Sequence, residues 1–581
     1  MDNITIARLL DETAALLEID AADPFRIRSY RRAAEAVEQQ TTQLATLVSD
    51  PKQLLAISGI GKGMAANIVD IVATGTMPLR EELLTKYKPS MLELLRLPGM
   101  GPKTVALLWS ALQVTDIDSL EEAAKAGHLA KLPRMGEKFA TKLLKGIEDY
   151  RRNSSRFRID QAREQADRIS ELIRAFPGID EITPAGSLRR GRETVGDLDL
   201  LVTGPACEPD VVSAAVDHVA GLPLIDKLLA KGQNKVSFNL RNGLQVDVRL
   251  LPRASYGAAL QYFTGSKMHN VALRQRAIKR GLTLNEYALA RLEDNTIVAA
   301  AREEDIYRAL DLDYIPPELR ENSGELEAAA TQALPQLITL TDIRGDLHMH
   351  TSETDGSNTI REMADAALAR GLKYIAITDH SKNLAMTNGM DNQRALAHVK
   401  RIRDVDAEMR GQIRVLAGIE VDILAEGELD LDDSTLAQMD IVVASIHSRF
   451  DQTIDQMTHR ILRAIENPHV RILGHPTGRK VLKRDPYALH IDTIVKRAAE
   501  LGVAVEHNAN PARADLNDLH LRVAKQHGCK IVVNTDAHSI VELDQMRYGI
   551  TQLRRAWLTP ADLVNTQPTA EALLSQMRPK P

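Results

Sequence analysis

The chain has 581 residues, of which 44% are hydrophobic and only 3% aromatic, so it can build several aliphatic cores and is expected to form three to five domains. Its formal net charge of −6 gives no bulk support for nucleic-acid binding, and any DNA contact has to come from local basic patches. Two cysteines, Cys207 and Cys529, and the lack of a long apolar run exclude a disulfide scaffold and a membrane-spanning protein, and we expect a cytoplasmic protein.

Residues 1–150 have apolar side chains at three- and four-residue spacing, which predicts a helical region. Three related turns interrupt it, at residues 57–63, 97–103 and 132–138. The first two contain Gly-x-Gly followed by lysine, as in a helix-hairpin-helix, whose second helix can grip a DNA phosphate with its N-terminal N–H groups. The third has Arg134 in place of the first glycine. One such turn is as often a plain helix connection, but three together predict DNA binding through Gly59, Gly61, Gly63, Gly99, Gly101 and Lys103.

A pair of acids marks the next region of the chain. Asp197 and Asp199 stand two residues apart in an apolar run, and alternate residues of a strand share one face, so both carboxylates project the same way. Asp247 also lies in a run of alternating apolar residues that predicts a strand. Neighbouring carboxylates repel one another unless a divalent cation neutralises them, and three of them can hold the pair of Mg²⁺ or Mn²⁺ ions that aligns the oxygens in phosphoryl transfer. A lone Asp-x-Asp is more often a solvated strand end.

The residues before this strand favour a triphosphate site over that plain alternative. A Gly186-Ser187 turn and Arg190 offer backbone N–H groups, a hydroxyl and a cation. With the three acids, they resemble the nucleotidyltransferase palm of family X DNA polymerases, and the resemblance continues at residues 262–274. It implies three catalytic, metal-binding acids (Asp197, Asp199, Asp247) and a set of nucleotide contacts: Gly186, Ser187, Arg190, Tyr262, Phe263, Gly265, Asn270 and Arg274.

The same resemblance implies how the first half of the chain divides. The expected units are a lyase-like helical domain, a helical fingers-type domain, a palm, a thumb and a linker, at residues 1–90, 91–150, 151–255, 256–315 and 316–340. In the family the first unit often carries a 5′-deoxyribose-phosphate lyase, whose lysine position is taken here by Asn67. An amide cannot form the imine that this lyase needs, so the sequence argues against the activity, with Lys62 as the nearby substitute.

From residue 341 to 581, short apolar strands alternate with helical stretches, the pattern of an α/β barrel. Strand after strand ends in a metal-binding side chain, and the C-terminal strand ends of such barrels collect on one face. Nine ligands exceed the needs of one ion, so we expect two or three Mn²⁺, Zn²⁺ or Fe ions. The candidate ligands are His348, His350, Asp355, His380, Glu420, His447, His475, Asp536 and His538. We do not expect His507 to be a ligand, and we expect six histidines at the surface: His398, His459, His469, His490, His520 and His527.

This second half resembles the polymerase-and-histidinol-phosphatase (PHP) domain, a distorted seven-fold (β/α) barrel with a trinuclear phosphoesterase site. The whole chain is therefore similar to the bacterial-type family X DNA polymerases, and its expected fold is multidomain α+β and α/β. The resemblance implies a monomer that fills short gaps with dNTPs at gapped or nicked DNA, and a metal-dependent 3′→5′ exonuclease acting on primer 3′ ends.

Three other functions stay open at this point. One is a 3′-end-processing nuclease whose weak palm serves mainly for DNA binding. The second is a non-enzymatic DNA-bridging protein, which would not explain nine retained ligands. The third is a phosphatase of small molecules, which the fusion to DNA-binding hairpins disfavours.

Overall fold

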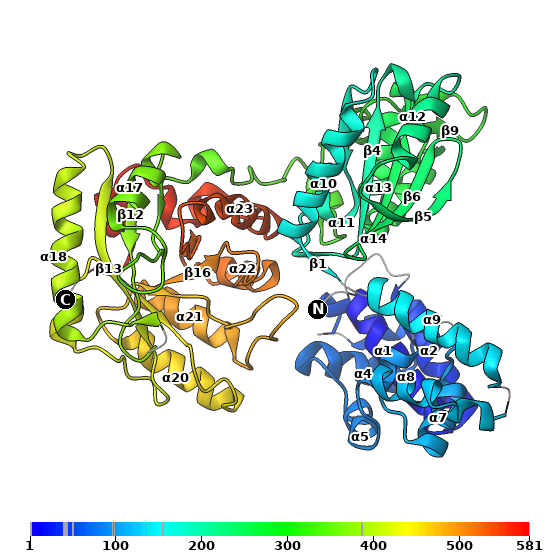
Figure 1. Cartoon of the computed structure of the whole chain (residues 1–581), viewed down its shortest axis with the longest axis horizontal. Coiled ribbons are helices and arrows are strands. Elements are labelled where there is room, and N and C mark those ends of the chain that lie inside the picture. The colour runs from blue at the N-terminus through cyan, green and yellow to red at the C-terminus, as the bar shows by residue number, and fades with distance from the viewer. Residues whose placement is uncertain are drawn as a thin grey trace.

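A computed structural model describes the chain at residues 3–38, 44–48, 51–57, 59–95, 97, 99–133, 135–153, 156–384 and 387–579. It has three lobes: a helical lobe, a lobe of palm and thumb, and a barrel (Figure 1). Three residues of the predicted hairpin turns, Ser58, Pro98 and Arg134, lie outside the described residues.

The helical lobe spans residues 3–153 and has a single hydrophobic cluster, which runs from Ile6 to Ile147 and so joins the two N-terminal units expected from the sequence. Both described hairpin turns need a glycine with positive φ, Gly59 (+97°) and Gly99 (+83°). The lobe's helices are α1 (Asn3–Ile19), α2 (Pro24–Glu38), α3 (Pro51–Leu55), α4 (Lys62–Thr74), α5 (Pro78–Lys86), α6 (Met91–Leu94), α7 (Pro102–Leu112), α8 (Ile117–Lys125) and α9 (Glu137–Asn153).

The palm is a five-stranded sheet with the order β2-β4-β7-β6-β5, in which only β4 and β7 are parallel neighbours. Helices α10 (Ile159–Arg174) and α12 (Val212–Ala220) pack into its main hydrophobic cluster. The face that carries Leu201 packs on α13 instead, and Asp197 and Asp199 alternate onto that same face. The strands are β2 (Glu181–Pro184), β4 (Asp197–Thr203), β5 (Ile225–Lys231), β6 (Lys235–Leu240) and β7 (Gln245–Leu250).

The thumb follows directly, and its core includes much of the segment expected to be a linker. Leu319, Leu326 and Leu337 belong to the thumb's hydrophobic cluster. Arg320 is fully buried and pairs with Glu303 at 2.6 Å, which fixes this segment to the thumb. The thumb's elements are α13 (Tyr256–Thr264), α14 (Lys267–Ile278), β8 (Leu282–Leu284), β9 (Leu289–Arg291), β10 (Ile297–Ala299) and α15 (Glu303–Ala309), with α16 (Glu325–Ala330) in the following segment.

The C-terminal lobe is a nearly closed barrel of seven parallel strands in chain order, as predicted. A bridge between Met349 and Ala537 links its first and last strands beyond their ends. The strands are β11 (Gly345–Asp346), β12 (Tyr374–Ile377), β13 (Arg414–Asp422), β14 (Ile441–Ser445), β15 (Ile472–Leu473), β16 (Ala504–Asn508) and β17 (Ile531–Asn534).

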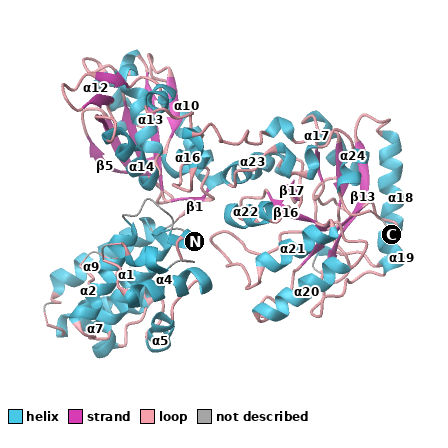
Figure 2. Ribbon diagram, turned by 180° about the vertical axis from the view of Figure 1, so that it is seen from behind, coloured by secondary structure: helices cyan, strands magenta, loops and turns pink. Residues whose placement is uncertain are grey.

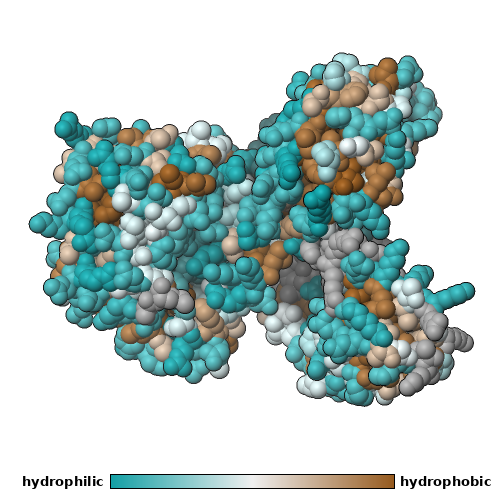
Figure 3. Space-filling view, viewed as in Figure 1, coloured by the Kyte–Doolittle hydropathy of each residue, from teal (hydrophilic) through white to brown (hydrophobic). Residues whose placement is uncertain are grey.

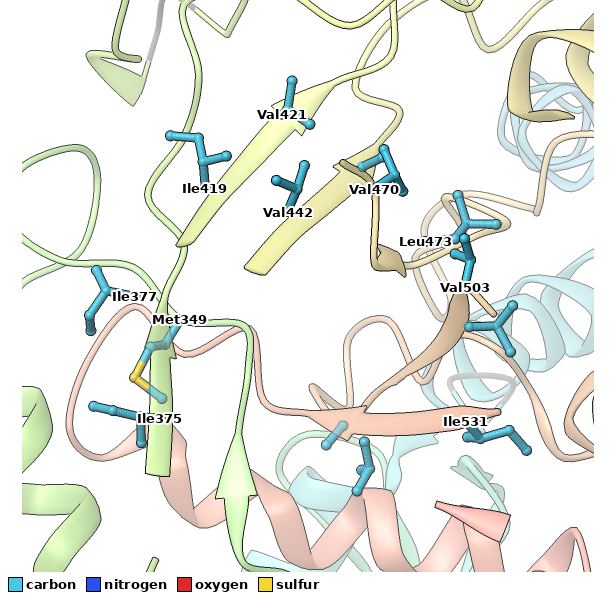
Figure 4. Packing of buried hydrophobic residues seen from close by; sticks show 14 of the residues in the cluster. Met349, Ile375, Ile377, Ile419, Val421, Val442, Val470, Leu473, Val503 and Ile531 are labelled. Atoms are coloured by element: carbon cyan, nitrogen blue, oxygen red, sulfur yellow. The ribbon is translucent and has the colours of Figure 1, made fainter. Parts of the chain in front are cut away.

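Aliphatic side chains from these strands pack outward against the surrounding helices, as Figure 4 shows for Ile375, Val442 and Leu473. The helices are α17 (Ile360–Ala369), α18 (Asn392–Glu408), α19 (Asp433–Leu436), α20 (Ile454–Glu466), α21 (Ile491–Leu501), α22 (Asp518–Gln526), α23 (Met546–Arg555) and α24 (Ala570–Gln576). Hydrophilic residues cover most of the barrel's face in Figure 3. Within the described parts of the chain, no helix is long and apolar enough to cross a membrane.

Candidate active sites

The palm brings the three predicted acids together through the pairing of β4 with β7, which places Asp199 opposite Asp247. Burial, with the charges of Asp197 and Asp247, raises the pKa of Asp199 to about 7. Lys235 on β6 contacts one oxygen of Asp247 at 2.8 Å, while the other oxygen is buried without a hydrogen-bond partner among the described residues. Mutual repulsion and an unpartnered carboxylate oxygen suit a divalent cation.

The Gly-Ser turn lies against these acids. Gly186 opens the short helix α11 (Gly186–Arg189) with a φ of +57°, and a Cβ there would lie 2.7 Å from Oδ2 of Asp199. Only glycine therefore allows the backbone of this turn to lie so close to the Asp199 carboxylate. Arg190 follows and donates through Nε to Glu321 (3.1 Å) and through Nη1 to the carbonyl oxygen of Thr264.

One pocket on this face joins the turn to helices α13 and α14. Asn270 is buried, and its amide accepts from Gln261 at 2.8 Å and donates to the carbonyl oxygen of Tyr262 at 2.7 Å, so that it holds the turn between these helices. Sequence reasoning missed Lys267, although a lysine directly after Gly265-Ser266 was a signal for an anion site. The lining comprises all eight predicted nucleotide contacts, two of the acids and this lysine: Gly186, Ser187, Arg190, Asp197, Asp199, Tyr262, Phe263, Gly265, Lys267, Asn270 and Arg274.

In the barrel, all nine predicted ligands gather at the C-terminal ends of the strands. Glu420 lies at their centre: its Oε1 is 3.0 Å from Nε2 of His475 and 3.5 Å from Nε2 of His447, and its Oε2 is 2.9 Å from Nδ1 of His380. Eight of the nine ligands form three overlapping groups with metal-binding spacing: His350, Asp355, His380 and His538; His348, His350 and Asp536; and His380, Glu420 and His447.

The ligand imidazoles fall into two states. Neighbouring carboxylates raise the pKa of His380 to about 10, so it holds a proton that a bound cation would displace, whereas His350 is already neutral. Burial and the neighbouring His380 lower the pKa of His350 to about 4, so the imidazole is neutral at neutral pH, the form that binds a metal. Four buried ligand atoms lack a hydrogen-bond partner within the described ranges: His348 Nε2, His350 Nδ1, His447 Nε2 and His475 Nδ1. Buried polar atoms are rarely left unsatisfied, and a metal cluster would satisfy these. The barrel can therefore hold metal ions at this cluster.

Residues behind the ligands hold them in place. Glu506 contacts Nδ1 of His348 at 2.7 Å and accepts from the backbone N–H of His475 at 2.7 Å, while Asn508 donates to Asp536 at 3.0 Å. The sequence interpretation did not assign Glu506 or Asn508, although their alternation on β16 places both on one face. His507 lies on the other face, and its Nδ1 contacts the carbonyl oxygen of Leu516 at 2.7 Å.

The prediction that His398 is a surface residue is wrong. It is buried on α18, and its Nε2 lies 2.9 Å from Oδ2 of Asp379. The inner face of α18 packs against the barrel, where Val399 joins the hydrophobic cluster. His398 lies on this inner face of α18, so its side chain is buried beside Asp379. The other five histidines in this set are exposed or half-buried.

The hairpin glycines lie at the N-terminal ends of two helices. Gly61 is the N-cap of α4 and Gly101 that of α7, so the first N–H groups of both helices lie at the turns. Gly63 and Lys103 belong to the first turns of these helices. Asn67 on α4 donates its amide to the hydroxyl of Tyr30 at 2.8 Å.

Known families match the chain in four stretches, in the order expected. A helix-hairpin-helix domain matches residues 1–77, a SAM-like helix-hairpin-helix tandem matches 91–149, a DNA polymerase beta thumb matches 259–321 and a PHP domain matches 346–509.

Relatives of this chain are of two kinds. A protein of Bacillus subtilis (strain 168) named DNA polymerase/3′-5′ exonuclease PolX is 38% identical over 97% of this chain and 97% of its own length. Proteins named probable phosphatase align over a smaller part of the chain. The one from Thermoanaerobacter sp. (strain X514) is 31% identical over 38% of this chain and 89% of its own length, and the one from Edwardsiella ictaluri (strain 93-146) is 29% identical over 41% and 95%.

Proposed function

The chain belongs to the bacterial-type family X DNA polymerases with a C-terminal PHP domain, and we propose that it fills short gaps during DNA repair and trims primer 3′ ends at the barrel. The observation that carries this proposal is that one chain holds two groups of side chains suited to these reactions. One is a pocket lined by two of the three acids, a Gly-Ser turn and cations, and the other is a cluster of nine candidate ligands, eight of them at metal-binding spacing.

In the palm, Asp197, Asp199 and Asp247 would hold Mg²⁺ or Mn²⁺, and the bound cation would neutralise the charge that develops during phosphoryl transfer. The N–H groups of the Gly186-Ser187 turn and the Arg190 guanidinium bind the triphosphate of a dNTP. Tyr262, Phe263 and Gly265 lie along its sugar, while Asn270 and Arg274 face the nascent base pair and the template. Such positioning is most of what in-line displacement requires of a protein.

In the barrel, two or three Mn²⁺, Zn²⁺ or Fe ions supply Lewis-acid activation of water and of the scissile phosphate when bound. The protein's own contribution is rigid placement: Glu506 sets the ring of His348, and Asn508 holds Asp536. The relatives named probable phosphatase support a second activity at the same site, removal of a 3′-phosphate.

The helical lobe would hold the DNA backbone through Gly59, Gly61, Gly63, Gly99, Gly101 and Lys103. We propose that the protein acts as a monomer in the cytoplasm on gapped or nicked duplexes. Asn67 is bonded to Tyr30 and cannot form an imine, which argues against a lyase activity and leaves Lys62 as the nearby substitute. We propose functional units at residues 1–90, 91–150, 151–255, 256–315 and 341–581, with residues 316–340 packed on the thumb and leading from it to the barrel.

The test uses a 5′-labelled primer in a duplex with a one-nucleotide gap, incubated with the full chain and Mn²⁺. Addition of one nucleotide in the presence of dNTPs, and shortening in their absence, is the expected result. Shortening under both conditions would favour a nuclease with an idle palm, and a primer that never changes would exclude both activities.

A further inference from the structure

Helix α23 belongs to the barrel but also lies against the polymerase lobe, and both ribbon views place it between the two lobes (Figures 1 and 2). Ile550 and Leu553 belong to the barrel's hydrophobic cluster, whereas Tyr548 packs against the cluster of the palm. A Cβ on Gly549 would lie 2.8 Å from Cγ2 of Val533, so the helix is pressed closely onto β17. The orientation of its outer face is therefore fixed by the barrel.

The outer face of α23 holds the end of the turn to which we assign triphosphate binding. Gln552 donates to the carbonyl oxygen of Gly191 at 2.7 Å, and Arg555 donates to that of Arg190 at 2.8 Å. Gly191 has a φ of +68°, and a Cβ there would lie 2.1 Å from Cγ2 of Thr551. The backbone at Arg190 and Gly191 thus contacts the barrel's helix, and there is no space for a side chain at position 191.

The same helix also sets the charge around Arg190. Oε1 of Glu321 accepts from Nε of Arg190 at 3.1 Å and from Nη1 of Arg555 at 3.0 Å. The Arg555 side chain is 4% exposed and is anchored to Asp518 at 2.8 Å, inside its own lobe. Arg192, at 3.9 Å, is a more distant cation for Glu321. Without Arg555, the Glu321 carboxylate would be balanced mainly by Arg190, whose charge would then be less available to an anion.

We propose that Arg555 of the PHP barrel is a positioning residue of the polymerase. It fixes the backbone of the triphosphate-binding turn and shares the charge of Glu321 with Arg190, so that more of the Arg190 charge is available to the triphosphate. The inference rests on the proposed function of the palm. The barrel lobe is then part of the nucleotide site, in addition to its own hydrolytic chemistry.

The test compares Arg555→Gln with Arg554→Gln in the full chain. Arg554 is the matched control because it is the adjacent arginine on α23 and also crosses to the polymerase half, where it pairs with Glu318 at 2.7 Å, away from the turn. Single-nucleotide gap filling gives the KM for the dNTP and kcat, and primer shortening without dNTPs reports on the barrel. We expect Arg555→Gln to raise KM roughly ten-fold with a smaller change in kcat, whereas Arg554→Gln leaves both within about two-fold.

A second change separates electrostatics from general damage. Glu321→Gln added to Arg555→Gln removes the uncompensated carboxylate, and we expect it to restore much of the lost dNTP affinity. Primer shortening stays near the parent rate in every folded variant. If Arg555→Gln loses this activity too and is therefore misfolded, Gln552→Ala replaces it, with an expected rise in KM of about three-fold from the lost hydrogen bond to Gly191.

The outcomes distinguish a failure of the proposed polymerase function from a failure of the role assigned to Arg555. A parent protein that never extends the primer removes the proposed polymerase function. A parent that extends it, with Arg555→Gln and Gln552→Ala no weaker for dNTP than Arg554→Gln, overturns the inference alone. Failure of Glu321→Gln to improve the KM of Arg555→Gln contradicts the role assigned to Glu321.

Discussion

The palm and the barrel both gather acidic side chains, but they balance the charge differently. In the palm, Asp197 is exposed and Asp199 is half-buried with a raised pKa. Among the described contacts, the close cations lie at Asp247, where Lys235 is at 2.8 Å and Arg249 at 4.0 Å. In the barrel, Glu420 is buried among imidazoles, which balance the negative charge of its carboxylate.

This difference bears on how each site holds its metals. Three acids at the edge of an open pocket bind a hard cation weakly, and a triphosphate supplies the remaining ligands. Nine convergent imidazoles and carboxylates at fixed strand ends can retain ions without substrate. We therefore expect exchangeable metals in the palm and resident metals in the barrel.

The largest expected effect is on the palm. Asp199→Asn removes a metal-binding charge between Asp197 and Asp247, and gap filling should fall at least about 10³-fold. Primer shortening by the barrel should stay unchanged in the same preparation. Asp210→Asn, an exposed acid of the same lobe, is the matched control. A substantial rate of extension by Asp199→Asn would remove the two-metal assignment.

The reverse separation is expected from the barrel. His350→Ala removes a buried imidazole shared by two of the ligand groups, and primer shortening should drop by about 10² or more. Gap filling should continue at the parent rate. His459→Ala, at an exposed histidine of the same lobe, should change neither activity. Loss of both activities in His350→Ala, with intact folding, would show that the sites are not separate.

A smaller effect is expected behind the ligands. Glu506→Gln keeps the shape of the side chain but weakens its contact with Nδ1 of His348, so the Mn²⁺ concentration for half-maximal shortening should rise by about 10- to 100-fold. The maximal rate at saturating Mn²⁺ should recover in part. An unchanged Mn²⁺ requirement would mean that Glu506 has no role in holding the ligand.

The smallest effect concerns stability, and we expect it in the palm because the negative charges of its acids are not fully balanced. The folded pKa of Asp199 is about 7 and its ordinary value is 3.8, so without metal the native state binds the extra proton between these values. The stability from that proton is present at low pH and is lost as the pH rises through about 7. In chelator, Asp199→Asn should therefore gain stability over the parent by about 2 kcal/mol at pH 8 and by much less at pH 4. A thermal-midpoint difference that does not grow with pH would contradict this.

The same two regions show how far the sequence predicts a site. Most of the barrel ligands could be assigned because they lie at or just after the C-terminal end of an apolar strand, and parallel strands bring their ends to one face. In the palm, the acids were assigned from their alternation within an apolar strand, and the Gly-Ser turn from its place just before that strand. Residues that act from another element were missed: Lys235 reaches Asp247 only through pairing of β6 with β7, and Arg555 reaches Arg190 only through docking of α23.

The segment at residues 316–340 illustrates a similar limit. Its proline-led, alanine-rich sequence is typical of a linker, yet Arg320 is fully buried against Glu303 of the thumb. A buried ion pair between residues that are distant in sequence is set by tertiary packing and leaves no periodic signal.

The most direct test of the contrast between the two sites is the metal content of the purified full chain, after loading with Mn²⁺ and gel filtration in metal-free buffer. We expect the parent and Asp199→Asn to retain roughly two or more ions per chain, as a multinuclear site would. Glu420→Gln, which is altered at the centre of the barrel cluster, should retain fewer than about one. Retention of no metal by the parent, or the same content in Glu420→Gln as in the parent, would contradict a resident metal cluster in the barrel.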